Sequence, residues 1–283
     1  MRSAVGRKRV LREVAIVLFQ ALLLAGFVRT FLFQSFNIPS ESMTPTLLIG
    51  DHLFVSKFSY GYNRYSFPLD MLPFSGRFFA RSPELGDVVV FRLPTDPSVD
   101  YIKRIVGTPG DRVQIKMGRL FINGVPVRRE LVSDPLSGSE LKLASNSNHD
   151  VRRVASNRKD KKDTSKLFKE TLPNGISYLT FQSEGASPPD GEARILFTVN
   201  HDNTIEYLVP EGHYFMLGDN RNNSQDSRFL GLVGYVPAEN LIGKAQVLFY
   251  SADTLGAKTW LGAFWITITQ PWRVRYSRFF TKL

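Results

Sequence analysis

The sequence predicts an all-β or β-rich domain that follows one transmembrane helix near the N-terminus. Two patterns predict this fold class: a continuous apolar run over residues 14–33, and short β-type runs between residues 35 and 250 with little sustained helical periodicity. The length of 283 residues is enough for one large or two modest domains with a substantial core.

Composition narrows the possible chemistry. Lys plus Arg number 36 against 26 Asp plus Glu, and the net charge of +10 favours contact with anionic lipid or nucleic acid without choosing between them. The chain has no cysteine, which excludes disulfides, iron–sulfur clusters, cysteine nucleophiles and thiolate zinc sites. A triad histidine or a three-histidine metal site has few candidates, namely His52, His149, His201 and His213. We expect no cofactor and no metal.

The apolar run predicts a membrane anchor. Residues 14–33 read VAIVLFQALLLAGFVRTFLF, with a single charge at Arg29 close to the far end, where its stem can reach the headgroups. Twenty residues at about 1.5 Å each match a hydrocarbon core of about 30 Å. The preceding tail, residues 1–13, carries the basic residues Arg2, Arg7, Lys8, Arg9 and Arg12.

A cleaved signal peptide is the competing interpretation of this segment. It requires small residues three and one positions before a cleavage site, and the following RTFLFQSFN offers no such pair. An uncleaved anchor is therefore favoured. The positive-inside rule then predicts a cytoplasmic tail and an exported domain after Phe33.

The exported part reads as a series of strands separated by turn residues. Predicted strands cover residues 52–60, 87–93, 101–107, 118–127 and 245–250. Within the fourth, Asn123 and Gly124 stand between apolar pairs and predict a tight hairpin. We expect residues 34–115 and 211–283 to form a β core and residues 116–210 an inserted β subdomain.

The inserted part contains a polar segment, residues 133–170, rich in Ser, Asn, Asp, Lys and Arg. It cannot bury enough apolar surface to offset the entropy of ordering, so a solvated, mobile segment is expected. A loop that binds lipid or nucleic acid is the alternative.

The C-terminal region allows two interpretations. Residues 260–269 are mostly apolar but too few to span a bilayer. Residues 272–280, WRVRYSRFF, alternate aromatic and basic side chains, as suits a surface in the headgroup region. A terminal strand that completes the core remains open.

Residues 36–51, FNIPSESMTPTLLIGD, form the first of four segments that invite a chemical interpretation. Pro39 and Pro45 hold a loop in which Ser40, Ser42 and Thr46 are polar among apolar neighbours. The loop follows the anchor closely, so it lies beside the membrane. A hydroxyl there is a candidate nucleophile, although serines in such loops are usually turn or cap residues.

The second segment, residues 100–111, is a strand with two adjacent cations. Alternation places Lys103 and Arg104 on opposite faces, so one of them must face inward. Burial can lower the pKa of a lysine by several units, whereas arginine cannot usefully lose its proton. Lys103 is therefore the better candidate base, against the alternative of a salt-bridged or snorkelling lysine.

The other two segments carry polar side chains that allow structural interpretations. Residues 218–231, GDNRNNSQDSRFLG, are dense in groups that can orient one another, either as turn chemistry or as support for a catalytic group. Residues 50–61 read as a strand after a turn. We interpret His52 and Lys57 there as ordinary strand residues.

Together, the anchor and the strings IPSESMTPTL, GDVVVF, YIKRIVGTPGD and GDNRNNSQDSRFLG, in this order, resemble the bacterial type I signal peptidase (leader peptidase) family. The match touches most of the chain outside the polar segment. The resemblance implies an all-β catalytic domain of the signal peptidase and LexA-like type. It also implies a membrane-anchored serine endopeptidase that removes signal peptides from exported preproteins at the outer face of the bacterial cytoplasmic membrane.

The resemblance also implies roles for individual residues. Ser42 matches the family's nucleophile and Lys103 its general base, a Ser/Lys dyad. Ser40 and the Ser42 amide match the oxyanion hole. The family's residues that orient or support the lysine correspond here to Ser224, Asp226 and Arg228. Asp219 corresponds to the acid expected to pair with Arg104. Pocket residues for the substrate's minus-one and minus-three side chains match Phe36, Ile38, Met43, Leu47, Tyr101 and Ile102.

Two positions depart from the family pattern. Asn222 stands where many members have Asp, and Glu41 stands where Gly is common between the two serines. These departures affect fine tuning more than activity. The partners implied are preprotein signal peptides and membrane lipid, with no nucleic acid and no metal.

Two rival functions stay open at this point. A LexA-like self-cleaving protein would also use a Ser/Lys pair on a β-rich fold, although the anchor and the lack of a helix-turn-helix pattern disfavour it. A membrane-anchored binding protein whose serine and lysine are structural is the other, and only cleavage of a preprotein separates it from an enzyme.

Overall fold

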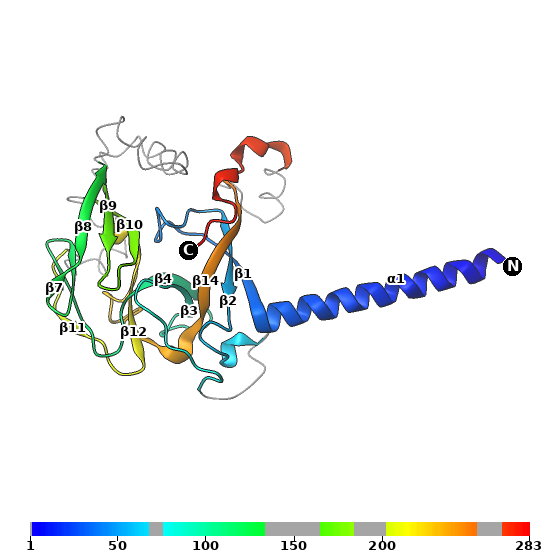
Figure 1. The fold of residues 1–283 in the computed structure, drawn as a ribbon, viewed down its shortest axis with the longest axis horizontal. Helices are drawn as coiled ribbons and strands as arrows, with labels where there is room; N and C mark the ends of the chain where they lie inside the picture. The colour runs from blue at the N-terminus through cyan, green and yellow to red at the C-terminus, as the bar shows by residue number, and fades with distance from the viewer. Residues whose placement is uncertain (1, 68–75, 134–164, 184–201, 254–267) are drawn as a thin grey trace.

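The computed structural model describes residues 2–67, 76–133, 165–183, 202–253 and 268–283. A long helix leaves one side of a β domain (Figure 1). Two small sheets and one large sheet form that domain, as the sequence predicts for a β-rich fold.

Helix α1 (Arg2–Phe27) continues through a short π-helix, Val28–Leu32, into the first strand. The stretch Val10–Leu32 has a mean hydropathy of 2.1, and none of it is buried against the rest of the protein. Leu22 and Leu24 expose 72% and 64% of their surface. An isolated helix of this length and apolar character fits a single membrane span.

The large sheet has seven strands in the order β1-β2-β14-β3-β4-β12-β13. Their bounds are β1 (Phe33–Asn37), β2 (Asp51–Ser56), β3 (Val88–Arg92), β4 (Asp100–Gly107), β12 (His213–Leu217), β13 (Val236–Pro237) and β14 (Leu241–Ser251). All neighbours in it are antiparallel. The predicted strands at 52–60, 87–93, 101–107 and 245–250 are confirmed, although β2 ends already at Ser56.

Two smaller sheets lie beside the large one (Figure 1). One has the order β11-β5-β6-β7, with bounds Tyr207–Leu208, Arg112–Lys116, Arg119–Ile122 and Val125–Pro126. Asn123 and Gly124 have φ of 52° and 78°, so the predicted hairpin turn is confirmed. The other has the order β10-β9-β8, with bounds Ser177–Ser183, Ser165–Thr171 and Arg128–Ser133.

Both faces of the large sheet are covered. Along β3, Val88 and Val90 belong to one buried apolar cluster, whereas Val89 and Phe91 belong to another. The neighbouring strand β4 therefore has no solvent face at its centre. For this reason Lys103 and Arg104 are both buried, at 3% and 5% exposure, where the sequence required only one inward cation.

The end of the polar segment differs from the sequence expectation. Residues 165–170 belong to strand β9, which is paired on both sides, to β8 and to β10. Leu167 and Glu170 are buried in this sheet, so these residues are ordered rather than mobile. Residues 134–164 lie outside the described part of the chain.

The C-terminal residues 272–283 run beside β14 without forming a continuous strand. They meet it through isolated pairings of Val274 with Ala252 and of Lys282 with Val247. Arg275 and Arg278 face inward and are buried, whereas Trp272, Tyr276 and Phe280 are exposed. Residues 272–280 thus turn Arg275 and Arg278 toward the protein and leave Trp272, Tyr276 and Phe280 exposed, while the Phe279 ring contacts that of Tyr250. Most of residues 260–269 lie outside the described ranges.

Candidate active site

Ser42 lies in the loop between β1 and β2, and the ends of this loop are tied together. The Ile38 amide donates to the Asp51 carbonyl at 2.9 Å, and the Gly50 amide donates to the Ile38 carbonyl at 3.0 Å. Met43 and Leu47 are fully buried and anchor the loop in the core. Ser42, 8% exposed, is therefore held in a fixed place at the surface.

Lys103 occupies the middle of β4, where it pairs with Val89 of β3. Its Nζ donates to Ser42 Oγ at 2.7 Å and to the Ile102 carbonyl at 2.9 Å. The structure therefore brings together the serine and the lysine that the sequence singled out.

The surroundings of Lys103 favour its neutral form. Burial lowers the pKa of Lys103 to about 8, against a partly compensating attraction from Asp226 and Asp219 and with a further lowering by Arg228. A lysine with this pKa is neutral in a useful fraction of molecules near pH 7 to 8. The hydrogen bond to Ser42 then places a proton acceptor against a hydroxyl.

The loop formed by residues 218–228 packs directly on the Ser42 loop. The Asn220 amide donates to the Ser42 carbonyl at 3.1 Å, and Asn220 Nδ2 donates to the Glu41 carbonyl at 3.1 Å. A Cβ on Gly218 would lie 2.5 Å from the Ser42 carbonyl and 2.2 Å from Ser224 Oγ. Position 218 must therefore be glycine for the two loops to approach this closely.

Two buried ion pairs flank the lysine. Arg228 holds Asp226 through both carboxylate oxygens, at 2.7 and 2.8 Å. Burial alone would raise the pKa of Asp226, but Arg228 and the Gly218 amide outweigh it and keep the pKa below its ordinary value. On the other side, Arg104 donates to Asp219 at 2.9 and 2.7 Å, which is the pairing that the resemblance implied.

Thr46, for which the sequence analysis assigned no role beyond being polar, contacts this second ion pair. Its Oγ1 donates to Asp219 Oδ2 at 2.5 Å. Thr46 lies on the Ser42 loop and Arg104 lies next to Lys103 on β4. Asp219 thus couples the serine-bearing loop to the lysine-bearing strand. The only signal in the sequence was a hydroxyl close to Ser42.

The two other serines to which the resemblance assigns roles, Ser40 and Ser224, have different surroundings. Ser40 is exposed, and its Oγ lies 3.4 Å from Ser42 Oγ. Ser224 is buried, but among the described residues the hydrogen-bond partners of Lys103 Nζ are Ser42 and Ile102 and do not include Ser224. The lysine-orienting contact implied for Ser224 is therefore not formed in this state of the molecule.

The side chains implied to line the substrate pockets fall into two groups. Ile38, Met43 and Leu47 are buried in the core beneath the loop. Phe36, Tyr101 and Ile102 are only half-buried and remain accessible. The structure therefore buries the first group beneath the Ser42 loop and leaves the second group partly exposed.

The two positions that depart from the family pattern lie at this site. Glu41 is half-buried beside Ser42, and Asn223 Nδ2 approaches its Oε2 at 3.4 Å. Asn222 is half-buried in the facing loop. Neither substitution prevents the direct hydrogen bond between Lys103 Nζ and Ser42 Oγ.

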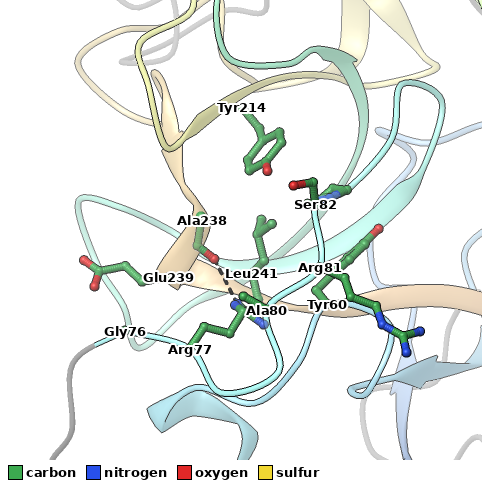
Figure 2. A pocket seen from close by; sticks show the side chains of 11 residues that line it. Tyr60, Gly76, Arg77, Ala80, Arg81, Ser82, Tyr214, Ala238, Glu239 and Leu241 are labelled. Carbon is green, nitrogen blue, oxygen red and sulfur yellow. Dashed lines mark hydrogen bonds between the residues drawn. The ribbon is translucent and has the colours of Figure 1, made fainter.

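Other polar features lie elsewhere. A cavity of about 350 Å³ is lined by residues that include Tyr60, Arg77 and Tyr214 but neither Ser42 nor Lys103, and Figure 2 shows its lining side chains. Lys57, interpreted from sequence as an ordinary strand residue, follows β2 and is buried, and burial with the nearby Arg29 lowers its pKa to about 8. Within the described residues, no three His, Asp or Glu side chains gather in a way that could hold a metal ion.

Comparisons with known proteins agree on one family. The profile of the family described as signal peptidase, peptidase S26, matches residues 11–250. A signal peptidase I from Rickettsia conorii is 37% identical over 265 residues, 92% of this chain and 88% of the relative. One from Rickettsia typhi is 37% identical over 281 residues, 98% of this chain and 95% of the relative.

Among solved structures, a signal peptidase I from Enterococcus faecalis matches with a TM-score of 0.29 and 24% identity, covering 58% of this chain and 97% of that chain. The range matched by the family profile spans the apolar helix, Ser42, Lys103 and the loop at residues 218–228.

Proposed function

From the premise that this chain belongs to the signal peptidase family, peptidase S26, we propose that Ser42 and Lys103 carry out its peptide cleavage. The chain is a serine peptidase that removes N-terminal signal peptides from preproteins. The observation that supports the assignment of the dyad is the 2.7 Å contact between Lys103 Nζ and Ser42 Oγ in a buried setting.

The first half of the reaction is acyl transfer to serine. Neutral Lys103 takes the Ser42 proton as Oγ attacks the scissile carbonyl, and the resulting ammonium returns a proton to the leaving amine. The new acyl–oxygen bond replaces the peptide bond, so the signal peptide is held as an ester. The lowered pKa of Lys103 makes the neutral amine available for this step.

The second half is hydrolysis of that ester. The Lys103 amine accepts a proton from water, the hydroxide attacks the ester carbonyl, and Ser42 leaves with the proton. In both halves an oxyanion forms on the carbonyl oxygen. We assign its donors to the Ser42 amide and the Ser40 hydroxyl, each of which is worth about 2.7 to 4 kcal/mol by analogy with other hydrolases.

The other polar residues support this geometry. The Asp219–Arg104 pair links the loop that carries Ser42 to the strand that carries Lys103. The Asp226–Arg228 pair supplies the two charges that act on the Lys103 ammonium in opposite directions. Ser224 is proposed to orient the ammonium once it forms.

Substrate recognition is assigned to the surface beside Ser42. We assign Phe36, Tyr101 and Ile102 to direct contact with the minus-one and minus-three side chains, and Ile38, Met43 and Leu47 to the floor beneath them. Apolar walls close to the nucleophile suit small, uncharged side chains at these positions.

The family and the apolar helix are consistent with a membrane-anchored protein. We propose that it spans the bacterial cytoplasmic membrane once, with residues 1–13 in the cytoplasm and the catalytic domain outside, because the basic residues precede the span. Membrane lipid is then a second partner. Confining enzyme and preprotein to one surface raises their effective concentration. Protease added to intact spheroplasts would digest the β domain, and full protection would reverse this orientation.

A single assay tests the assignment of the nucleophile. The detergent-solubilised full chain and Ser42→Ala are incubated with a preprotein, with circular dichroism as the control for folding. Loss of cleavage in a folded Ser42→Ala supports the dyad. Retained cleavage would return Ser42 to an ordinary loop serine, and an intact preprotein with the wild type would favour a binding protein.

A further inference from the structure

A buried glutamate in the inserted part of the chain touches the loop that carries the lysine's supporting groups. Glu170 lies on β9 and is 1% exposed. Both terminal guanidinium nitrogens of Arg221, Nη1 and Nη2, donate to its carboxylate, Nη1 at 3.1 Å to Oε1. The Tyr178 hydroxyl donates to Oε2 at 3.0 Å.

The strand beside β9 is fixed to the same loop through its backbone. The Phe181 amide of β10 donates to the Asp219 carbonyl at 2.9 Å, and Phe181 also pairs with Asn220 as an isolated parallel bridge. The β9–β10 hairpin therefore contacts residues 219–221 through both backbone and side chains. This is the loop that also binds the Ser42 carbonyl through the Asn220 amide.

From Arg221 the contacts continue to the catalytic lysine. The Arg221 carbonyl accepts a hydrogen bond from Arg228 at 2.6 Å. Arg228 holds Asp226, and the Asp226 charge acts on Lys103. Three buried residues, Arg221, Arg228 and Asp226, thus connect Glu170 to the base.

A second route runs through Tyr178. The Arg104 guanidinium lies over the Tyr178 ring, 4.2 Å from its centroid. Arg104 pairs with Asp219, which binds Thr46 of the Ser42 loop. Tyr178 therefore contacts one of the ion pairs that flank the dyad, through Arg104, and Glu170 is linked to the other through Arg221.

The Glu170–Arg221 contact is a buried ion pair, so the loss of one partner leaves the other charge unpaired. Arg221 is 4% exposed, and Glu170 is its carboxylate partner. A second cation, Arg129, lies with its Nε 3.9 Å from Glu170 Oε1. A buried guanidinium that loses its carboxylate cannot stay dry, because an unpaired buried charge is strongly unfavourable. Residues 220–224 would then move toward water and open the protein around Lys103.

We propose that Glu170 is a positioning residue for the Ser/Lys dyad, so that the β9–β10 hairpin belongs to the catalytic framework and is not a passive insertion. This inference rests on the proposed role of Lys103. Its consequence is specific: the hairpin keeps Lys103 dry, and burial is the largest cause of that lysine's lowered pKa.

The test replaces Glu170 by Gln in the full chain and measures kcat and KM for preprotein cleavage from pH 6 to 10. Without the buried pair, water reaches Lys103 and its pKa rises toward the ordinary lysine value. A rise of one unit lowers the neutral fraction, and with it kcat at pH 7, about tenfold. The acidic limb of the pH profile therefore moves to higher pH, activity recovers in alkaline solution, and Glu170→Asp restores part of the wild-type profile.

Glu130→Gln is the matched control. Glu130 lies on β8 of the same small sheet, is exposed, and pairs at the surface with Arg128. It should show the wild-type profile. If Glu170→Gln does not fold, Tyr178→Phe is the smaller change, because it removes the hydroxyl that donates a hydrogen bond to Glu170 and keeps the ring. This variant should shift the acidic limb of the pH profile in the same direction, by a smaller amount.

Two results would overturn the inference. One is a folded Glu170→Gln with the wild-type pH profile, and the other is a loss of activity that is equal at every pH. If the proposed role of Lys103 itself is wrong, the result is different: Lys103→Arg would then cleave the preprotein, independently of the result for Glu170→Gln.

Discussion

Lys103 Nζ lies 2.7 Å from Ser42 Oγ, although the two residues are 61 positions apart in the chain. One comes from the middle of a central strand and the other from a loop beside the membrane span. Their meeting depends on the pairing of β3 with β4 and on the packing of the Ser42 loop against residues 218–228. Activity should therefore respond to groups that hold these parts together as well as to the two side chains.

Replacement of Lys103 by Arg should abolish cleavage. The guanidinium keeps the charge and much of the length but cannot accept the Ser42 proton. In the wild type, the rate should rise as the pH passes through about 8, because above this pH the buried lysine is neutral. Kinetics from pH 6 to 10 measure both effects.

The control for this prediction uses histidines. His52→Ala and His213→Ala should keep most of the activity, since neither side chain takes part in the dyad. Comparable loss on removing either histidine, or turnover by Lys103→Arg, would contradict the assignment of the base.

Removal of the charge on Asp219 should destabilise the protein and slow it. Asp219→Asn leaves the buried Arg104 without its carboxylate, and breaking a buried pair in this way costs about 3 to 5 kcal/mol. Asp100→Asn, which breaks the more exposed pair with Arg92 at 3.2 Å, should cost no more than about 1 kcal/mol. Urea unfolding of the two solubilised variants compares them, and equal losses would show that the Asp219 pair has no special role.

The sequence predicts the fold best where its patterns are local. The apolar helix and most strands are visible as runs, and the Asn123–Gly124 turn follows from two residues that tolerate positive φ. The limits of β2 and β9 are not visible in this way. Residues 165–170 have a polar composition, but pairing with strands on both sides orders them, and pairing is a property of the whole fold.

At the site, the sequence predicts which residues are candidates for catalysis, but it does not predict which side chains surround them. Alternation correctly separated Lys103 from Arg104, yet it could not reveal that both faces of β4 are covered. The roles of Thr46 and Glu170 depend on partners more than 50 positions away, Asp219 and Arg221. No local pattern records such contacts.

The C-terminal arginines should be required for the Ser42 loop. Arg278 holds the fully buried Asp51 at 2.6 Å and donates to the Thr46 carbonyl at 2.9 Å. Arg278→Met leaves the Asp51 carboxylate poorly paired, and we expect a loss of about 3 kcal/mol or more in the free energy of unfolding together with slower cleavage. Limited proteolysis and preprotein cleavage measure the two effects.

Arg273 provides the comparison, because its contact with Asp253 is longer, 3.8 Å, and partly exposed. Arg273→Met should leave both stability and cleavage close to the wild type. If the two methionine variants behave alike, the link from Arg278 to the Ser42 loop does not matter for catalysis.

Shortening residues 137–162 should leave folding and cleavage largely intact. These residues lie outside the described ranges, and on either side β8 and β9 pair, with Ser133 opposite Leu167. The entropy of closing a loop changes slowly with its length, by about 0.6 kcal/mol per doubling. Circular dichroism and the preprotein assay test this expectation, which a shortened chain unable to fold would refute.

Replacement of Lys103 by Met should stabilise the protein while abolishing its activity. The pKa of Lys103 falls from 10.5 to about 8 on folding, so below pH 8 the folded protein carries an ammonium that burial disfavours. This difference is worth about 3 kcal/mol, of which the lost hydrogen bonds to Ser42 and Ile102 cancel a part, so we expect a gain of about 1 to 3 kcal/mol at pH 7. As the pH rises from 8 to above 10.5, the wild type recovers this stability and the advantage of Lys103→Met should disappear. Urea unfolding at pH 7 and pH 10.5 measures it, and a variant less stable than the wild type at pH 7 would show that Lys103 is not held against its preferred charge.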